Sequence, residues 1–151
     1  MRPLRQDDYD ALYAAASDPL IWEQHPDERW REDAFRAFFA EHLATGGALA
    51  VLDARSGEVI GTSRYHNYDP AGSEVEIGWT FLARAYWGGT YNAELKRLML
   101  EHAFRSVETV LFVVVPGNMR SQRAVEKLGA VQTGTRYDDV RGERLVFALR
   151  R

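Results

Sequence analysis

The chain has 151 residues, of which 46% are hydrophobic and 27% are charged, and its formal net charge at pH 7 is -3. These values suit one globular domain, 1–151, and argue against a general nucleic-acid binder. The chain has no cysteine, which excludes disulfides, thiolate zinc sites and a cysteine nucleophile. It has neither a secretory signal pattern nor an apolar run that could span a membrane, so we expect a cytoplasmic protein with no membrane partner.

The first third of the chain predicts a short edge strand and two helices. The extended piece 1–5 is too short for a full strand, and a helix begins behind Asp7, which is a good N-cap residue. The pair 18–19 ends this helix, because a residue before proline disfavours helical geometry. A second helix stops near the glycines at 46–47, and its apolar stripe consists of Phe35, Phe38, Phe39 and Leu43.

Three strands then follow in series and predict an antiparallel meander. Their expected bounds are 48–53, 58–65 and 74–82. Turn-forming residues at 54–57 and 69–72 join them as hairpins. The third strand alternates without a break, so one face carries Val75, Ile77, Trp79 and Phe81.

The second half predicts helical crossovers around a buried strand. A third helix, 90–104, has one side formed by Tyr91, Leu95, Leu98, Met99 and His102. The apolar run 110–115 indicates a strand buried on both faces, and a fourth helix runs from its N-cap Asn118 to Gly129. The segments 130–137 and 144–150 read as a closing hairpin. The element order indicates an α+β (mixed α/β) fold, with a mixed, largely antiparallel sheet of six to seven strands and helices on both faces.

A glycine-bearing turn, 86–90, stands between the third strand and the third helix. Glycine lets the backbone approach a ligand, and the free N–H groups of a first helical turn attract anions. The turn is neither a P-loop nor a dinucleotide fingerprint, because it lacks the spacing of both. The sequence therefore indicates a phosphate-binding turn, and the alternative is a plain strand-to-helix connection.

A second polar group lies at the start of the fourth helix, where Asn118 and Ser121 are one turn apart behind the buried strand. Cations at helical spacing follow them, namely Arg120, Arg123 and Lys127. The alternative interpretation makes Asn118 an ordinary N-cap, Ser121 a first-turn residue and the cations a solvated face. A capping role would not prevent Asn118 from contacting a ligand.

Together these two segments resemble the GCN5-related N-acetyltransferase (GNAT) superfamily, and in particular its RimJ/RimL-like branch of ribosomal-protein alanine acetyltransferases. The resemblance covers nearly the whole chain, and its motifs lie at 2–8, 17–19, 59–65, 76–79, 86–89 and 118–129. The family's pyrophosphate pattern, laid on Gly88, places Ala85 and Thr90 at positions where the family has other residues. Thr90 departs from a small residue that normally lets phosphates approach the backbone.

The resemblance implies acetyl-coenzyme A as co-substrate and no metal. Its pyrophosphate would bind the N–H groups from Gly88 to Tyr91, and its pantetheine arm would pair with the backbone near 80–82. Asn118 and Ser121 would face the pantetheine and the sulfur. The implied cofactor-binding residues are Thr80, Phe81, Leu82, Trp87, Gly88, Gly89, Thr90, Tyr91, Asn118 and Ser121.

Acetyl transfer to an amine benefits from a general base and from a proton donor for the leaving thiolate. Glu76 is the candidate base, since several family members have a glutamate at the matching place; the alternative is a solvated glutamate paired with an arginine. Backbone N–H groups near 79–81 are candidates for stabilising the oxyanion. Val125 occupies the place of the tyrosine that protonates the thiolate in many members, so Ser121, which matches the serine of the RimJ/RimL-like branch, is the candidate donor.

The acceptor is expected between the first two helices and the end of the second strand. Its candidate residues are Trp22, His25, Arg64, Tyr65, His66 and Trp79. Trp22 and Trp79 could equally form core or pocket wall. The chain's 4 histidines show no metal-ligand spacing.

We therefore expect an N-acetyltransferase that moves an acetyl group directly to a primary amine of a protein N-terminus or small molecule. One alternative is transfer of another acyl group such as succinyl, whose extra carboxylate Arg64 would bind. Another is a non-catalytic coenzyme A-binding regulatory module, which Val125 and Thr90 favour. A homodimer is also open, because the first strand leaves a short sheet edge.

Overall fold

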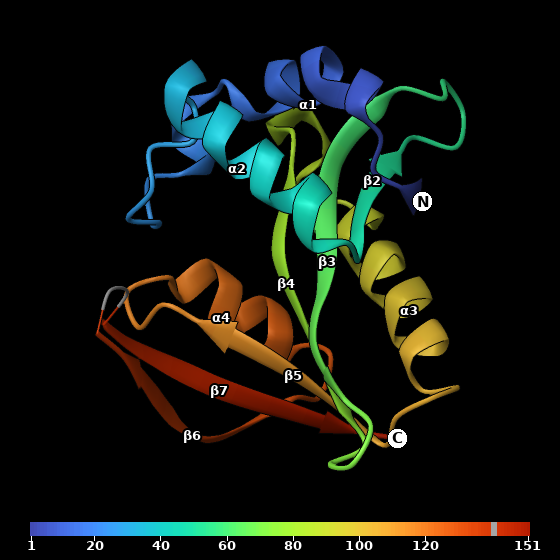
Figure 1. The fold of residues 1–151 in the computed structure, drawn as a ribbon, viewed down its shortest axis with the longest axis vertical. Coiled ribbons are helices and arrows are strands. Elements are labelled where there is room, and N and C mark those ends of the chain that lie inside the picture. Colours follow the sequence, from blue (N-terminus) through green and yellow to red (C-terminus); the bar gives the residue numbers. More distant parts are fainter. Residues whose placement is uncertain (140–141) are drawn as a thin grey trace. The chain divides into compact units, whose positions relative to one another are not determined.

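The computed structural model describes residues 1–139 and 142–151, and the chain forms two compact units (Figure 1). The first unit comprises Met1–Arg64 and Trp79–Leu95, and the second comprises Tyr65–Gly78 and Lys96–Arg151. Two strands and one helix therefore pass covalently from one unit into the other. The bounds of the α-helices and strands are β1 (Arg2–Pro3), α1 (Tyr9–Ala16), α2 (Glu32–Thr45), β2 (Ala48–Leu52), β3 (Val59–Asp69), β4 (Glu74–Leu82), α3 (Tyr91–Ala103), β5 (Thr109–Val114), α4 (Met119–Glu126), β6 (Val131–Asp138) and β7 (Gly142–Arg150).

The strands follow the hydrogen-bonded order β1-β2-β3-β4-β5-β7-β6. The pairs β1–β2, β2–β3, β5–β7 and β6–β7 are antiparallel, and β4 pairs with β5 in parallel through Glu74–Glu76. The predicted fold class, a mixed and largely antiparallel sheet with helices, is confirmed with seven strands. β1 is only two residues long, shorter than the predicted extended piece 1–5.

The first unit packs α1 and α2 around a core of aromatic side chains. The apolar stripe of α2 is correctly predicted, because Phe35, Phe38 and Phe39 are all buried at helical spacing. Gly46, with φ of 68°, ends the helix in a conformation that favours glycine. An ion pair between Arg2 and Asp8 at 2.6 Å fixes the entry to α1. The buried members of this core are Leu12, Ala16, Ile21, Trp22, Phe35, Phe38, Phe39 and Phe81.

Two strands approach each other very closely inside the first unit. A Cβ atom added at Gly61 of β3 would lie 2.1 Å from the carbonyl oxygen of Phe81 in β4. No real side chain tolerates such a contact with backbone, so only glycine fits at this position. The Ala83 N–H also donates to the Ile60 carbonyl at 2.8 Å, which continues the contact past the end of β4.

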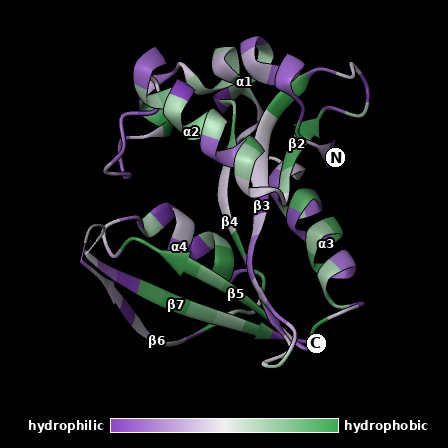
Figure 2. Ribbon diagram, viewed as in Figure 1, coloured by the Kyte–Doolittle hydropathy of each residue, from purple (hydrophilic) through white to green (hydrophobic). Residues whose placement is uncertain are grey.

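The second unit is built on β5 and β7, which Figure 2 colours as hydrophobic over much of their length. Val110, Leu111 and Phe112 are buried in β5, and Val146 and Phe147 are buried in β7. The prediction that 110–115 is buried on both faces is wrong at its end, because alternate residues there are partly exposed. The antiparallel register of β5 with β7 explains the apolar run, since both strands contribute to the same core.

The predicted apolar side of α3 is partly wrong. Leu95 and Met99 are buried as predicted, whereas Leu98 is 37% exposed. The buried row instead includes Lys96, which lies in the second unit, with its Nζ atom 5.7 Å from the centre of the Phe112 ring. Burial lowers the Lys96 pKa to about 7. Both rows have helical spacing, so the pattern alone could not decide which one faces the core.

The predicted unbroken alternation of β4 fails at Trp79. This residue has φ of 50°, in the left-handed region that non-glycine residues seldom adopt. Such a conformation costs about 1–3 kcal/mol and is often found at functional sites. β3 is also longer than the predicted 58–65, since it continues to Asp69.

Candidate active site

The glycine turn of the first unit connects the end of β4 to α3. A short 3-10 helix, Arg84–Tyr86, leads into Trp87, whose indole Nε1 donates to the Leu82 carbonyl at 2.8 Å. Gly88 has φ of 73°, and no atom would contact a Cβ added there. The Thr90 carbonyl accepts the Glu94 N–H at 2.8 Å, so Thr90 occupies the N-cap position of α3.

The backbone of this turn offers hydrogen-bond donors to solvent. Gly88, Gly89 and Thr90 are exposed. Within residues 1–139 and 142–151, no protein acceptor takes the amide N–H groups of Gly88 or Gly89. The N-terminus of a helix adds a favourable field for negative charge. These residues therefore fit a phosphate group, and phosphate binding at the turn stays a prediction, as does the alternative of a plain strand-to-helix connection.

One cation near this turn was missed by the sequence reasoning. The Arg55 guanidinium donates to the Tyr91 hydroxyl at 3.1 Å, and the rings of Tyr86 and Tyr91 meet at 4.9 Å. Arg55 lies in the hairpin between β2 and β3, thirty-six residues from its partner. Such a separation hides the contact from any local pattern.

The end of β4 presents backbone rather than side chains. Phe81 and Leu82 are buried, with Phe81 meeting Trp22 at a ring distance of 5.1 Å. The Thr80 hydroxyl lies 2.7 Å from that of Ser63, within hydrogen-bond distance. Residues 80–82 would therefore bind the pantetheine arm through main-chain groups, and this binding stays a prediction.

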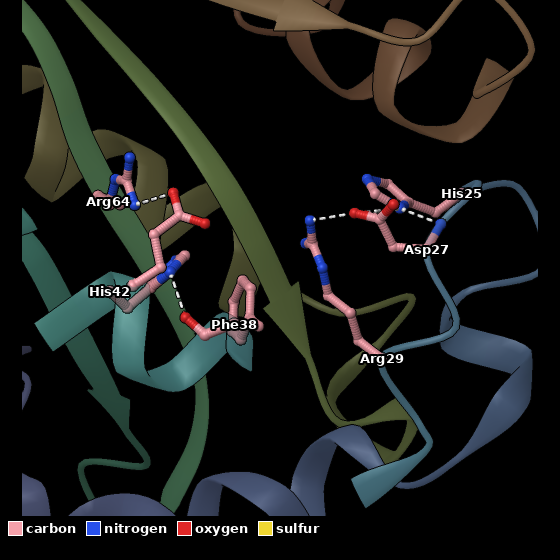
Figure 3. A network of polar contacts seen from close by, with 7 residues as sticks. His25, Asp27, Arg29, Phe38, His42 and Arg64 are labelled. Atoms are coloured by element: carbon pink, nitrogen blue, oxygen red, sulfur yellow. Dashed lines mark hydrogen bonds and ion pairs between the residues drawn. The ribbon is translucent and has the colours of Figure 1, made fainter. Parts of the chain in front are cut away.

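Four residues predicted to bind the acceptor, Trp22, His25, Arg64 and Trp79, belong to the first unit, and Figure 3 labels His25 and Arg64. The Arg64 guanidinium is buried with 1% exposure, 4.1 Å from the centre of the Trp79 ring, and its Nη1 donates to Glu41 Oε1 at 3.3 Å. Trp22 is buried, and its Nε1 donates to the Ala16 carbonyl at 2.8 Å, so Trp22 belongs to the core. The His25 ring packs edge-on against Trp22 at 6.0 Å.

Sequence reasoning missed two residues that lie against the Phe38 ring in the first unit. Arg29 lies over the Phe38 ring at 4.5 Å, and His42 stacks on the same ring at 3.9 Å. His42 Nδ1 is 3.1 Å from the Phe38 carbonyl, one helical turn away in α2. Helical spacing indicates the place of Phe38 and His42, but no pattern in the irregular segment before α2 marks Arg29.

Tyr65, another residue predicted for the acceptor, belongs to the second unit. Its hydroxyl donates to the Met99 carbonyl at 2.7 Å, and burial raises the pKa of Tyr65 to about 12. Its ring also meets His102 at 5.8 Å. These contacts give Tyr65 a structural role in the second unit, and a role in acceptor binding stays a prediction.

Glu76, the candidate base, is buried in β4 within the second unit. Its carboxylate Oε1 accepts a hydrogen bond from Asn67 Nδ2 at 3.0 Å and forms an ion pair with Arg136 of β6. The side chain of Glu76 is 7% exposed and that of Arg136 is 45% exposed. The alternative prediction, a solvated glutamate paired with an arginine, is right about the arginine. It is wrong about the solvation, because Glu76 is buried.

Asn118 and Ser121 adopt the predicted capping arrangement in the second unit. The Ser121 N–H donates to Asn118 Oδ1 at 3.0 Å, and Asn118 itself is buried. Val125 is buried on the same helix. The Val125 side chain therefore contributes to the core. Ser121 carries the hydroxyl that lies nearest in sequence to the start of α4, and its role as proton donor stays a prediction.

The family model for the acetyltransferase (GNAT) domain matches residues 1–131. The chain belongs to this family, whose members transfer an acetyl group from acetyl-coenzyme A to an amine. No curated protein matches the sequence.

Solved structures share the fold. One from T. thermophilus, named for an expected acetyltransferase activity, is 31% identical, has a TM-score of 0.78, and aligns over 98% of this chain and 83% of its own. Mycobacterium smegmatis RimJ, in complex with CoA-disulfide, is 19% identical and has a TM-score of 0.72. The alignment covers 99% of this chain and 80% of RimJ. Vibrio cholerae spermidine N-acetyltransferase, in complex with CoA and spermine, is 16% identical and has a TM-score of 0.73. The alignment covers 99% of this chain and 93% of that protein.

Two further properties concern only residues 1–139 and 142–151. No helix there is long and apolar enough to cross a membrane. No cluster of three or more His, Asp or Glu side chains there could hold a metal ion.

Proposed function

We propose that the protein is an N-acetyltransferase of the RimJ/RimL-like branch. It transfers the acetyl group of acetyl-coenzyme A directly to a primary amine of a protein N-terminus or small molecule. The observation that carries the proposal is the exposed turn ahead of α3, where the Gly88 and Gly89 amides have no protein acceptor among the described residues. A single domain over 1–151 and a cytoplasmic location are part of the same proposal.

The groups proposed to bind acetyl-coenzyme A are assigned to each unit by itself. In the first unit, the amides from Gly88 to Tyr91 would hold the pyrophosphate, because a helix N-terminus favours anions. In the second unit, Asn118 would hold the pantetheine. Acetyl-coenzyme A supplies the activated acyl carbon when it is bound.

Two side chains would handle protons. The Glu76 carboxylate would accept a proton from the incoming ammonium, directly or through a water molecule. The Ser121 hydroxyl would donate a hydrogen bond to the leaving sulfur. Serine has little acidity of its own, so Ser121 would contribute less than a tyrosine or histidine acid.

A substitution at Gly88 tests the phosphate site against a matched control. Gly88 and Gly57 have φ of 73° and 76°, and neither has an atom within 4 Å of an added Cβ. Gly88→Ala and Gly57→Ala should therefore lose similar stability, about 1–2 kcal/mol each. Only Gly88→Ala should weaken acetyl-coenzyme A binding in calorimetry, by roughly tenfold, which is about 1.4 kcal/mol. Absence of heat with the unmodified protein would refute the proposal.

Donor and acceptor panels separate the remaining alternatives. Free-thiol release with acetyl- and succinyl-coenzyme A identifies the acyl group, and the pair of Arg64 with Glu41 is the feature that would respond to a succinyl carboxylate. A non-catalytic module is supported by the ion pair that already occupies Glu76. Such a module would bind coenzyme A and yet release no thiol with any amine.

A further inference from the structure

Arg29 is held in an unusual position by the irregular segment that precedes α2. Its guanidinium carbon lies 5.5 Å from the centre of the Trp22 ring and 4.5 Å from that of Phe38. The Arg29 side chain is only 12% exposed. Two aromatic faces therefore fix the guanidinium in place, since a cation is attracted to the face of a ring.

One acidic partner of Arg29, Asp27, is much more exposed than Arg29 itself. Arg29 Nη2 donates to Asp27 Oδ2 at 2.6 Å, but the Asp27 side chain is 52% exposed and lies two residues away on the same segment. The Asp27 N–H donates to His25 Nδ1 at 3.1 Å, which keeps this segment turned on itself. A buried cation needs an anion nearby, and an exposed aspartate can give up that place to another carboxylate.

The same arrangement recurs at Arg64. Its guanidinium is buried over Trp79, and its partner Glu41 is 45% exposed. Ring contacts lead from Phe38 to His42 at 3.9 Å and from His42 to Trp79 at 6.3 Å. Ring contacts thus connect both arginines within the first unit, and Figure 3 labels Arg29, Phe38, His42 and Arg64.

We propose that Arg29 determines acceptor specificity by binding a carboxylate of the acceptor, so the acceptor is an amine that also carries a carboxylate. The inference rests on the proposed function and names its substrate class. A guanidinium has its N–H groups in a planar fork that matches the two oxygens of a carboxylate. A polyamine such as spermine would place like charge beside two fixed guanidinium groups. The carboxylate can belong to a free amino acid or to an acidic peptide N-terminus.

Matched acceptors test the inference through acetyl-coenzyme A-dependent thiol release. One arm compares 4-aminobutyrate with butylamine and L-phenylalanine with phenethylamine. The other arm compares the peptides Ala-Asp-Ala and Ala-Asn-Ala, both with amidated C-termini. We expect kcat/KM to favour the carboxylate in at least one arm by roughly ten- to a hundredfold, the range for hydrogen bonds to a charged group. The arm that responds distinguishes an amino acid from a peptide.

Three variants assign this preference to Arg29. Arg29→Gln should remove it, mainly by raising KM, and Arg29→Lys should retain only part, because lysine lacks the fork. Asp27→Asn removes the competing carboxylate and should lower KM for the carboxylated acceptor. Arg36→Gln is the control, since Arg36 is 70% exposed on α2 and pairs with Glu32. The preference ratio is insensitive to a general loss of folded protein, and acetyl-coenzyme A binding shows that each variant is folded.

The outcomes separate this inference from the proposed function. Equal kcat/KM within every pair, a preference for spermine, or an unchanged ratio in Arg29→Gln would overturn the inference while leaving acetyl transfer intact. Absence of thiol release with every amine would overturn the proposed function. In that case calorimetry with the same matched pairs still tests the inference, which predicts heat only with the carboxylated member in at least one arm and loss of that heat in Arg29→Gln.

Discussion

Two ion pairs, Arg64–Glu41 in the first unit and Arg136–Glu76 in the second, each join a buried side chain to an exposed one, and they are arranged in opposite ways. In the second unit the acid is inside, because Glu76 is 7% exposed and Arg136 is 45% exposed. In the first unit the cation is inside, because Arg64 is 1% exposed and Glu41 is 45% exposed. The buried member is fixed by its surroundings, whereas the exposed member can move or be replaced. The Arg64 pair thus keeps a positive charge in place, and the Glu76 pair keeps a negative charge in place.

The largest effect should come from removing the exposed member of the pair in the second unit. Arg136→Met leaves the buried Glu76 carboxylate without its cation and should lower the free energy of unfolding by about 3 kcal/mol. Arg64→Met removes the buried charge itself and leaves only an exposed glutamate, so it should cost less. Urea denaturation of both variants measures the difference. A smaller loss in Arg136→Met than in Arg64→Met would contradict the comparison.

The two glutamates of these pairs should differ next in turnover. Glu76→Gln should lower kcat by roughly a hundredfold if the carboxylate is the base, the lower end for general acid-base catalysis. Glu41→Gln, the matched change in the first unit, should change kcat by less than about threefold, since Glu41 holds no proposed catalytic role. Thiol release at saturating acetyl-coenzyme A measures both. Equal kcat values for the two variants would remove Glu76 from the mechanism.

Lys96 sharpens the comparison, because it is a buried cation that can lose its proton, as Arg64 cannot. Its pKa in the folded protein is lowered from 10.5 to about 7. Above pH 7 the unfolded chain therefore binds the proton that the folded chain has released, and stability should rise with pH. Between pH 7 and 9.5 the rise should approach about 1.4 kcal/mol per pH unit. This window lies below the range in which Tyr65 titrates.

Urea denaturation across that pH window tests Lys96. Lys96→Met should flatten the rise, while Lys127→Met, at an exposed position of the chain, should leave it unchanged. The same slope in both variants would show that another group is responsible.

The smallest effect should come from Ser121. Ser121→Ala should lower kcat by roughly tenfold, below the upper range for general acids, because a serine hydroxyl only hydrogen-bonds the thiolate. The Asn118 cap accepts a backbone N–H, so the helix should keep its stability in this variant. Asn118→Ala should instead cost about 1 kcal/mol of stability through loss of the cap. An unchanged kcat in Ser121→Ala would place the proton donor elsewhere.

Local rules of the sequence predicted much of this molecule, and long-range contacts account for the rest. The α2 stripe, the Asn118 cap and the Gly88 turn each depend on residues within one or two turns of one another. The partner of Glu76 is sixty residues away, so no local pattern could identify it. Lys96 was missed because a charged residue is seldom expected inside a core.

Among the residues predicted to bind the acceptor, local patterns again indicated some features, and long-range contacts determined others. Arg64 and Trp79, both predicted for the acceptor, lie in contact in the first unit, and their role there stays a prediction. No pattern in the alternating strand indicated the left-handed backbone of Trp79. Arg29 lies in a segment without periodicity, so its position over two rings depends on tertiary packing alone.

The missing methyl group at Gly61 has a consequence for how accurately the protein could hold a thioester. Because β3 contacts the Phe81 carbonyl at this position, the contact restrains the β4 backbone that we propose binds the pantetheine. Gly61→Ala would displace the β4 backbone at Phe81 without changing any residue proposed to contact a reactant. Alignment of the acyl carbon would then be limited by a residue that has no side chain and no chemistry of its own.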